Sequence, residues 1–140
     1  MTIRTATYLD APAIKLLLEV LGYTARYSLI VDQLELMFGK DDHQVFVYEL
    51  KKEVIGFVSV HFLPQLAFEG GLMVITYLSA DDAGIAQALE KYVTEQARLR
   101  KCDRIQVHLL EWRTPAHQFY VQQGYHEYPK YFIKRLVYAE

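Results

Sequence analysis

The sequence predicts an α/β (α+β) domain in which about four helices flank a mixed, mostly antiparallel sheet of about six or seven strands. Segments rich in β-branched and aromatic residues alternate with segments whose apolar residues recur at helical spacing. Two neighbouring strands in the middle suggest a hairpin, and a strand–helix–strand unit follows. With 140 residues, 52% of them hydrophobic, and a net charge of -2, the chain is expected to be one folded domain, 1–140.

The first half is expected to start with a strand over Ile3–Tyr8, followed by two helices. Asp10 begins the first helix, and Gly22 ends it because glycine is the usual residue just after a helix. Apolar residues at helical spacing place the second helix at Ser28–Phe38. The order continues with strands, and the helices are expected to cover the sheet.

The middle of the chain is expected to be sheet. Strands over Gln44–Glu49 and Val54–Phe62 are separated by the charged run Lys51–Glu53, which suits a hairpin turn. A third strand covers Leu72–Leu78. Together they predict an antiparallel meander.

The remaining elements are a long helix, a strand, a short helix and two final strands. Apolar spacing and a basic C-terminal end define the long helix. In chain order these elements are expected at Asp82–Arg100, Arg104–Leu110, Pro115–Gln123, Tyr125–Tyr128 and Tyr131–Val137. The predicted order is therefore β-α-α-β-β-β-α-β-α-β-β.

Composition excludes several classes of protein. The single cysteine, Cys102, cannot form an internal disulfide, and the five histidines show no ligand spacing, so no metal is expected. No apolar run reaches the roughly 18 residues of a membrane span, and the N-terminus is unlike a signal peptide. The near-neutral charge gives no electrostatic case for nucleic acid. A cytoplasmic protein that binds neither membrane nor nucleic acid is expected.

The run Ala116–Tyr125 carries a more specific pattern. It reads Ala, two residues, Phe-Tyr, three residues, Gly and an aromatic residue, with Tyr125 where phenylalanine is more common. The segment Val54–Val60 contains a Gly-Phe pair within a hairpin strand. In this order and spacing, the sequence resembles the GCN5-related N-acetyltransferase (GNAT) superfamily over essentially the whole chain. The resemblance implies the GNAT fold.

The family binds the pyrophosphate of acetyl-CoA with Arg or Gln, two residues, Gly, one residue, and Gly or Ala. The corresponding run here is Asp81–Ala86, in a shortened loop, where Gly84 and Ala86 match and Asp81 replaces the basic or amide residue. Glycine lets the backbone approach an anion, and free N–H groups at a helix start face it. Carboxylates at such a position are also ordinary helix caps, and this reading stays open.

The resemblance implies an N-acetyltransferase that moves an acetyl group from its co-substrate acetyl-CoA to a primary amine of a small molecule or peptide. The pantetheine arm would pair with the fourth strand where it splays from the fifth. Arg113 could reach a phosphate or lie in solvent. The cofactor-binding residues implied in this way are Ile75, Thr76, Tyr77, Leu78, Gly84, Ile85, Ala86 and Arg113.

Tyr120 stands where a tyrosine of the family often protonates the leaving thiolate, a step that suits a phenol with a pKa near 10. The alternative is a packing tyrosine. No general base is evident, because Thr76 follows Ile75 where many members have glutamate. The other candidates for a base are more readily explained as structural or surface residues: His61, His108, Glu69 and Glu111. A chain of water molecules could also carry the proton to solvent.

Aromatic residues are expected around the acceptor, and they suit an amine with an apolar or cationic body. The candidates are Tyr23, Tyr27, Phe62, Phe68, Tyr128 and Tyr131. Two alternatives remain. One is a non-catalytic GNAT-like binding or regulatory domain that has lost CoA binding. The other is a homodimer formed through the segment Tyr131–Val137, which is compatible with activity.

Overall fold

The structure, a computed structural model, describes residues 2–109, 114–128 and 132–138. The chain forms two compact units, Met1–Val107 and His108–Glu140. The first unit contains a five-stranded sheet and most of the helices. The described residues of the second unit contain one helix, α4 (Thr114–Gln122).

The sheet has the strand order β1-β2-β3-β4-β5. The first four strands are antiparallel to their neighbours, whereas β4 and β5 run parallel because α3 connects them. The elements of the first unit are β1 (Thr2–Thr5), the 3-10 helix η1 (Tyr8–Asp10), α1 (Ala11–Val20), α2 (Tyr27–Met37), β2 (His43–Leu50), β3 (Glu53–Leu63), β4 (Leu72–Ala80), α3 (Ala83–Leu99) and β5 (Arg104–Val107).

The predicted element order is confirmed up to α4, but the ends of two strands differ by three residues. The first strand ends at Thr5, because Thr7 and Asp10 form a capping box that starts η1 and places Tyr8 in a helical turn. The strand β5 ends at Val107, so His108 lies beyond it, and Leu110 lies outside the described residues.

The two predicted C-terminal strands are not observed where the structure describes them. Residues 125–128 and 132–137 carry no strand, and 131 lies outside the described residues. Among the described residues the sheet therefore has five strands, where six or seven were predicted. A strand needs a partner for its backbone groups, and side-chain preference alone did not reveal whether one was present.

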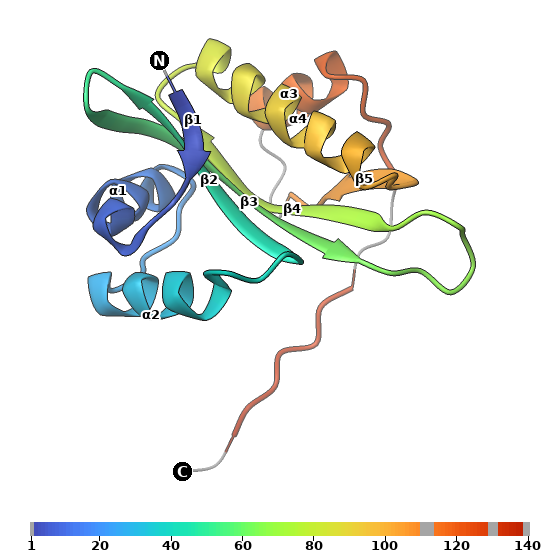
Figure 1. Ribbon diagram of the computed structural model, residues 1–140, viewed down its shortest axis with the longest axis horizontal. Helices are drawn as coiled ribbons and strands as arrows, with labels where there is room; N and C mark the ends of the chain where they lie inside the picture. The colour runs from blue at the N-terminus through green and yellow to red at the C-terminus, as the bar shows by residue number, and fades with distance from the viewer. Residues whose placement is uncertain (1, 110–113, 129–131, 139–140) are drawn as a thin grey trace. The chain divides into compact units, whose positions relative to one another are not determined.

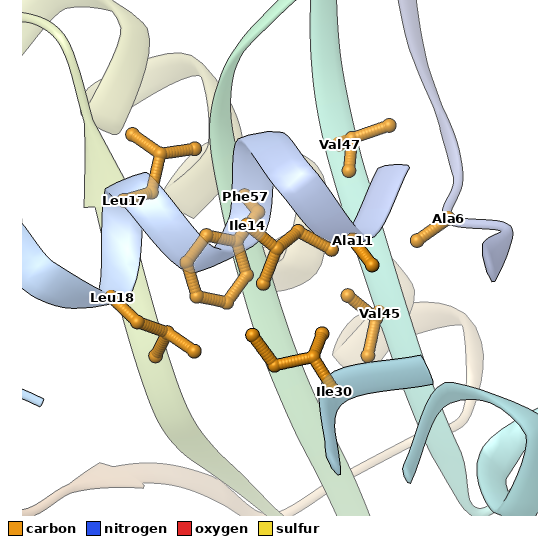
Figure 2. Close-up of a cluster of buried hydrophobic side chains, with 9 residues drawn as sticks. All are labelled: Ala6, Ala11, Ile14, Leu17, Leu18, Ile30, Val45, Val47 and Phe57. Carbon is orange, nitrogen blue, oxygen red and sulfur yellow. The ribbon is translucent and has the colours of Figure 1, made fainter. Parts of the chain in front are cut away.

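Helices cover both faces of the sheet in the first unit, with α1 and α2 on one face and α3 on the other (Figure 1). Figure 2 shows the core between the sheet and the first two helices, where Phe57 of β3 lies among side chains of α1 and β2. Because side chains alternate along a strand, Val45 and Val47 enter this core while Phe46 contacts Tyr92 of α3.

The turn between β2 and β3 has only two residues, Lys51 and Lys52. Both have positive φ angles, 51° and 66°, as a type I′ hairpin turn requires. The predicted hairpin is confirmed. The pairing then shifts by one residue, because Ile55 is bulged between the pairs Glu49–Val54 and Tyr48–Gly56.

Gly56 lets α3 approach the sheet. A Cβ atom at this position would lie 2.9 Å from Cγ2 of Ile85 and 3.0 Å from Cδ1 of Leu89, and it would also crowd Ala80 at 3.2 Å. Leu89 is completely buried, so these groups have little room to move. The N-terminal half of α3 can therefore pack directly against β3 because Gly56 has no side chain.

We expect Gly56→Ala to lower the free energy of unfolding by about 1–3 kcal/mol, because the added methyl overpacks the contact with α3. Urea denaturation followed by circular dichroism measures this change. Gly84→Ala is the matched control, since a Cβ atom at that position meets only Oδ1 of Asp82, at 3.3 Å, and should cost little. Equal denaturation midpoints for Gly56→Ala and wild type would contradict the prediction.

A three-membered ion network joins β1, η1 and β2. The guanidinium of Arg4 donates a hydrogen bond of 2.9 Å to each carboxylate oxygen of Asp10 and another of 2.9 Å to Oε1 of Glu49. The N–H group of Thr7 also donates to Asp10, at 2.8 Å. Burial alone would raise the pKa of Asp10, but the bonds from Arg4 and Thr7 outweigh it, so this pKa lies below its usual range.

We expect Arg4→Met to lower the free energy of unfolding by about 2 kcal/mol at pH 7, because it leaves the buried Asp10 carboxylate without its cation. The advantage of wild type should be complete above about pH 3.9, the pKa of an unfolded aspartate, and should fade as the pH falls through the lower folded pKa. Thermal denaturation between pH 2 and pH 7 tests this. Lys15→Met, which removes an exposed ion pair with Glu19, should change stability by less than about 0.5 kcal/mol.

Candidate functional site

The strand β4 is paired on both sides in its first half only. Its parallel pairing with β5 ends at Ile75 opposite Val107, whereas its antiparallel pairing with β3 continues to Ala80 opposite Gly56. Among the described residues, the stretch from Thr76 to Ala80 is therefore paired only with β3. This free edge contains three of the four β4 residues predicted to hold the cofactor.

A β-bulge lies where the free edge begins. Tyr77 pairs with Ser59 and Ile75 pairs with Val60, which leaves Thr76 as the extra residue of β4. The hydroxyl of Thr76 donates a hydrogen bond of 3.1 Å to the carbonyl of Ser59, so the side chain supports the bulge. Ile75 itself is 1% exposed and belongs to the core, so only its backbone could meet a ligand.

The free edge leads directly to the start of α3. Asp82 caps this helix, because its Oδ1 accepts a hydrogen bond of 2.9 Å from the N–H of Ile85 and its carbonyl accepts from Ala86. Within the described ranges, the N–H groups of Ala83 and Gly84 are left without a partner. Except for the Oδ1 of Asp82, no atom lies within 4 Å of a Cβ built on Gly84, so a ligand can approach its backbone.

The two aspartates before α3 have different roles. The capping reading is confirmed for Asp82. Asp81 instead donates its backbone N–H to the carbonyl of Ile55, at 2.9 Å, and is exposed. Both carboxylates weaken the attraction of the helix start for an anion, since like charges repel.

Two predicted site residues meet on the face of the sheet that α1 and α2 cover. Tyr23 follows α1, Tyr77 lies on the free edge of β4, and their rings are in edge-to-face contact with centroids 5.3 Å apart. Tyr77 is 37% exposed, and Tyr27, at the start of α2, is 49% exposed. Tyr77, predicted to bind the cofactor, and Tyr23, predicted to bind the acceptor, are thus in contact.

The structure does not bring Phe62 and Phe68 together with these tyrosines. Phe62 is buried near the end of β3, where the guanidinium of Arg100 lies 3.8 Å from its ring centroid. Phe68 lies before β4, and the guanidinium of Arg104 lies 4.3 Å from its ring centroid. Both phenylalanines therefore lie toward the start of β4, and the tyrosine pair lies in its second half.

In the second unit, α4 carries Tyr120. This tyrosine is 8% exposed, and its ring contacts those of Phe119 and Tyr125 at centroid distances of 5.2 and 5.3 Å. Such packing fixes the direction of its phenol. Tyr128 is exposed, whereas Arg113, Glu111 and Tyr131 lie outside the described residues.

A pair of histidines is the feature that sequence reasoning missed. Nδ1 of His43 in β2 lies 2.8 Å from Nδ1 of His61 in β3, so the two rings share a hydrogen bond. The sequence offers His61 only as a lone candidate, because nothing in it indicates the partner. The two-residue hairpin turn approximates the register, but only the bulge at Ile55 places the two histidines opposite each other.

Within residues 2–109, 114–128 and 132–138, no group of three or more His, Cys, Asp and Glu side chains is arranged to hold a metal ion. No helix of these ranges has the length and apolar character needed to cross a bilayer.

Solved structures share this fold. A transcriptional regulator from Bacillus halodurans C-125 superimposes with a TM-score of 0.84 over 96% of this chain and 99% of its own, at 22% identity. An aminoglycoside acetyltransferase from an uncultured soil metagenomic sample, solved with trehalose, gives 0.76 over 97% and 96%, at 19% identity. A mutant of the BH1408 protein from Bacillus halodurans gives 0.81 over 98% and 100%, at 16% identity.

No curated protein matches the sequence. The family model described as "Acetyltransferase (GNAT) family" matches residues 14–125. This range begins within α1 and ends just after α4, so it contains the bulged strand β4, the start of α3 and Tyr120. Because the match spans most of the chain, the protein belongs to the GNAT acetyltransferase family.

Proposed function

We propose that the protein is an N-acetyltransferase that transfers the acetyl group of acetyl-CoA to a primary amine of a small molecule or peptide. The observation that carries the proposal is the free edge of β4, which runs from the bulge at Thr76 to the unpaired N–H groups of Ala83 and Gly84. An extended arm with amide groups can pair with such an edge. A pyrophosphate can bind at the start of the helix that follows.

The chemistry joins the amine nitrogen to the carbonyl carbon of the thioester. The nitrogen loses a proton, and the tetrahedral intermediate then collapses with cleavage of the C–S bond. The thiolate that leaves takes a proton, for which we propose the phenol of Tyr120 as the donor. Its low exposure and its ring contacts with Phe119 and Tyr125 support this role, because a ring held by packing needs little reorganisation during the reaction.

The half-buried Tyr23 and the exposed Tyr77 support an acceptor with an apolar or cationic body. Their rings form an edge-to-face pair beside the bulge, and aromatic rings attract both apolar groups and ammonium ions. Amines suitable for a first screen are phenethylamine, an aminoglycoside and a short peptide with a free N-terminus. The aminoglycoside is included because one structural relative acts on that class.

Acetyl-CoA at saturating concentration is expected to raise the free energy of unfolding by about 2–3 kcal/mol, because it binds only the folded chain. Differential scanning fluorimetry detects this as a higher Tm. Gly84→Glu should abolish the shift, since it places a carboxylate at the start of α3. Ser28→Glu adds the same charge to the first turn of α2 and should leave the shift intact.

The absence of any shift with wild type at millimolar acetyl-CoA would exclude the acetyltransferase. It would favour instead a GNAT-like domain that has lost CoA binding, for which the two carboxylates at Asp81 and Asp82 are the supporting observation. A shift that survives Gly84→Glu would remove the start of α3 from the cofactor site.

Tyr120→Phe is expected to lower kcat about 100-fold while the Tm shift with acetyl-CoA is retained, because only the proton donor is lost. Release of free CoA thiol in the presence of an acceptor amine from the screen measures kcat. Tyr48→Phe removes a hydroxyl from β2 and serves as the control. An unchanged kcat for Tyr120→Phe would show that Tyr120 is a packing residue.

A further inference from the structure

The histidine pair lies on the same face of the sheet as the tyrosine pair. Side chains of β3 alternate, so His61 shares a face with Ser59, which pairs with Tyr77 of β4. His61 itself pairs with Val74, so it lies on this face beyond the bulge from Tyr77. A substrate that extends from the Tyr23–Tyr77 pair along this face toward Val74 meets the imidazole.

The neighbours of the pair determine which nitrogen carries each proton. The Asp42 carboxylate lies 3.7 Å from Nε2 of His43 and favours a proton on that nitrogen. Nδ1 of His43 is then the acceptor in the 2.8 Å hydrogen bond, and Nδ1–H of His61 is the donor. In this tautomer Nε2 of His61 carries a lone pair, and it has no hydrogen-bond partner in the part of the chain that the structure describes.

The charge state of His61 fits the same role. Burial and the neighbouring His43 lower the pKa of His61, and Asp42 opposes them less strongly. From β4 the register places the apolar Val74 opposite His61, with the phenol of Tyr77 beyond the bulge. The imidazole is therefore neutral at pH 7, as a base must be.

We propose that Nε2 of His61 is the general base that takes a proton from the acceptor amine, with His43 and Asp42 as positioning residues. The proposal rests on the proposed function. The amine arrives as ammonium, one N–H bond breaks, its electron pair stays on nitrogen, and the proton forms an N–H bond at Nε2. The imidazolium then donates a charge-assisted Nδ1–H bond to His43, and it returns the proton to solvent after the product leaves.

Amines of different basicity test this role. Phenethylamine is protonated at neutral pH and needs a base, whereas O-benzylhydroxylamine has the same ring and is largely unprotonated. We expect His61→Gln to lower kcat/KM for phenethylamine about 100-fold at pH 7 but to change kcat/KM for O-benzylhydroxylamine by less than about threefold. The loss for phenethylamine should shrink toward pH 9, where more of the free amine is present.

Two further variants separate a base from a packing residue. His43→Gln should lower kcat/KM for phenethylamine about tenfold and displace the acidic limb of its pH profile, because the hydrogen-bond partner of His61 is changed. His126→Gln, in an exposed histidine of the second unit, should change neither. Equal losses on the two amines in His61→Gln would overturn the proposal.

Nitrogen-15 NMR of the imidazoles gives a readout independent of turnover. We expect His61 to be neutral at pH 7 with its proton on Nδ1, and a charged His61 or a proton on Nε2 would overturn the proposal. The Tm shift with acetyl-CoA tests the proposed function separately. If wild type shows no Tm shift, the proposed acetyltransferase function is excluded. If the shift is normal but His61 has the other tautomer, only the role of His61 as the base is excluded.

Discussion

The backbone hydrogen bonds of β4 are the constraint on which the proposed site depends. In its first half β4 is bonded to strands on both sides, and in its second half β3 is its only partner among the described residues. The change occurs at Thr76, the extra residue that interrupts the ladder. Its side-chain hydroxyl donates a hydrogen bond to the carbonyl of Ser59. Backbone groups in the second half are thus available to a ligand although the strand stays paired with β3.

Packing of α3 adds to this arrangement. The absence of a side chain at Gly56 lets Ile85 and Leu89 lie close to β3, which fixes the start of the helix at the end of the free edge. Asp82 then satisfies one of the first N–H groups and leaves those of Ala83 and Gly84 open. Gly56 thus allows close packing in the core and also positions the unpaired N–H groups of Ala83 and Gly84.

Local patterns predicted most of the fold, and long-range pairing determined what they missed. Helical spacing, turn residues and alternation are local, so the order through α4 followed from the sequence. The bulges at Ile55 and Thr76 depend on how neighbouring strands pair, and no residue type signals them. The role of His43 therefore could not be predicted from the sequence. Tyr23, Tyr77 and Gly84 could be proposed from the family pattern without knowledge of their contacts.

The free edge of β4 also has a consequence for solubility. Any extended polypeptide, including a strand of an unfolded neighbour, can add to an unpaired edge and begin aggregation. The bulge at Thr76 interrupts that edge at one end, and the charges of Asp81 and Asp82 follow it at the other. Such features discourage strand addition in other proteins. The carboxylates that weaken the attraction for a phosphate can thus protect the protein while its edge is empty.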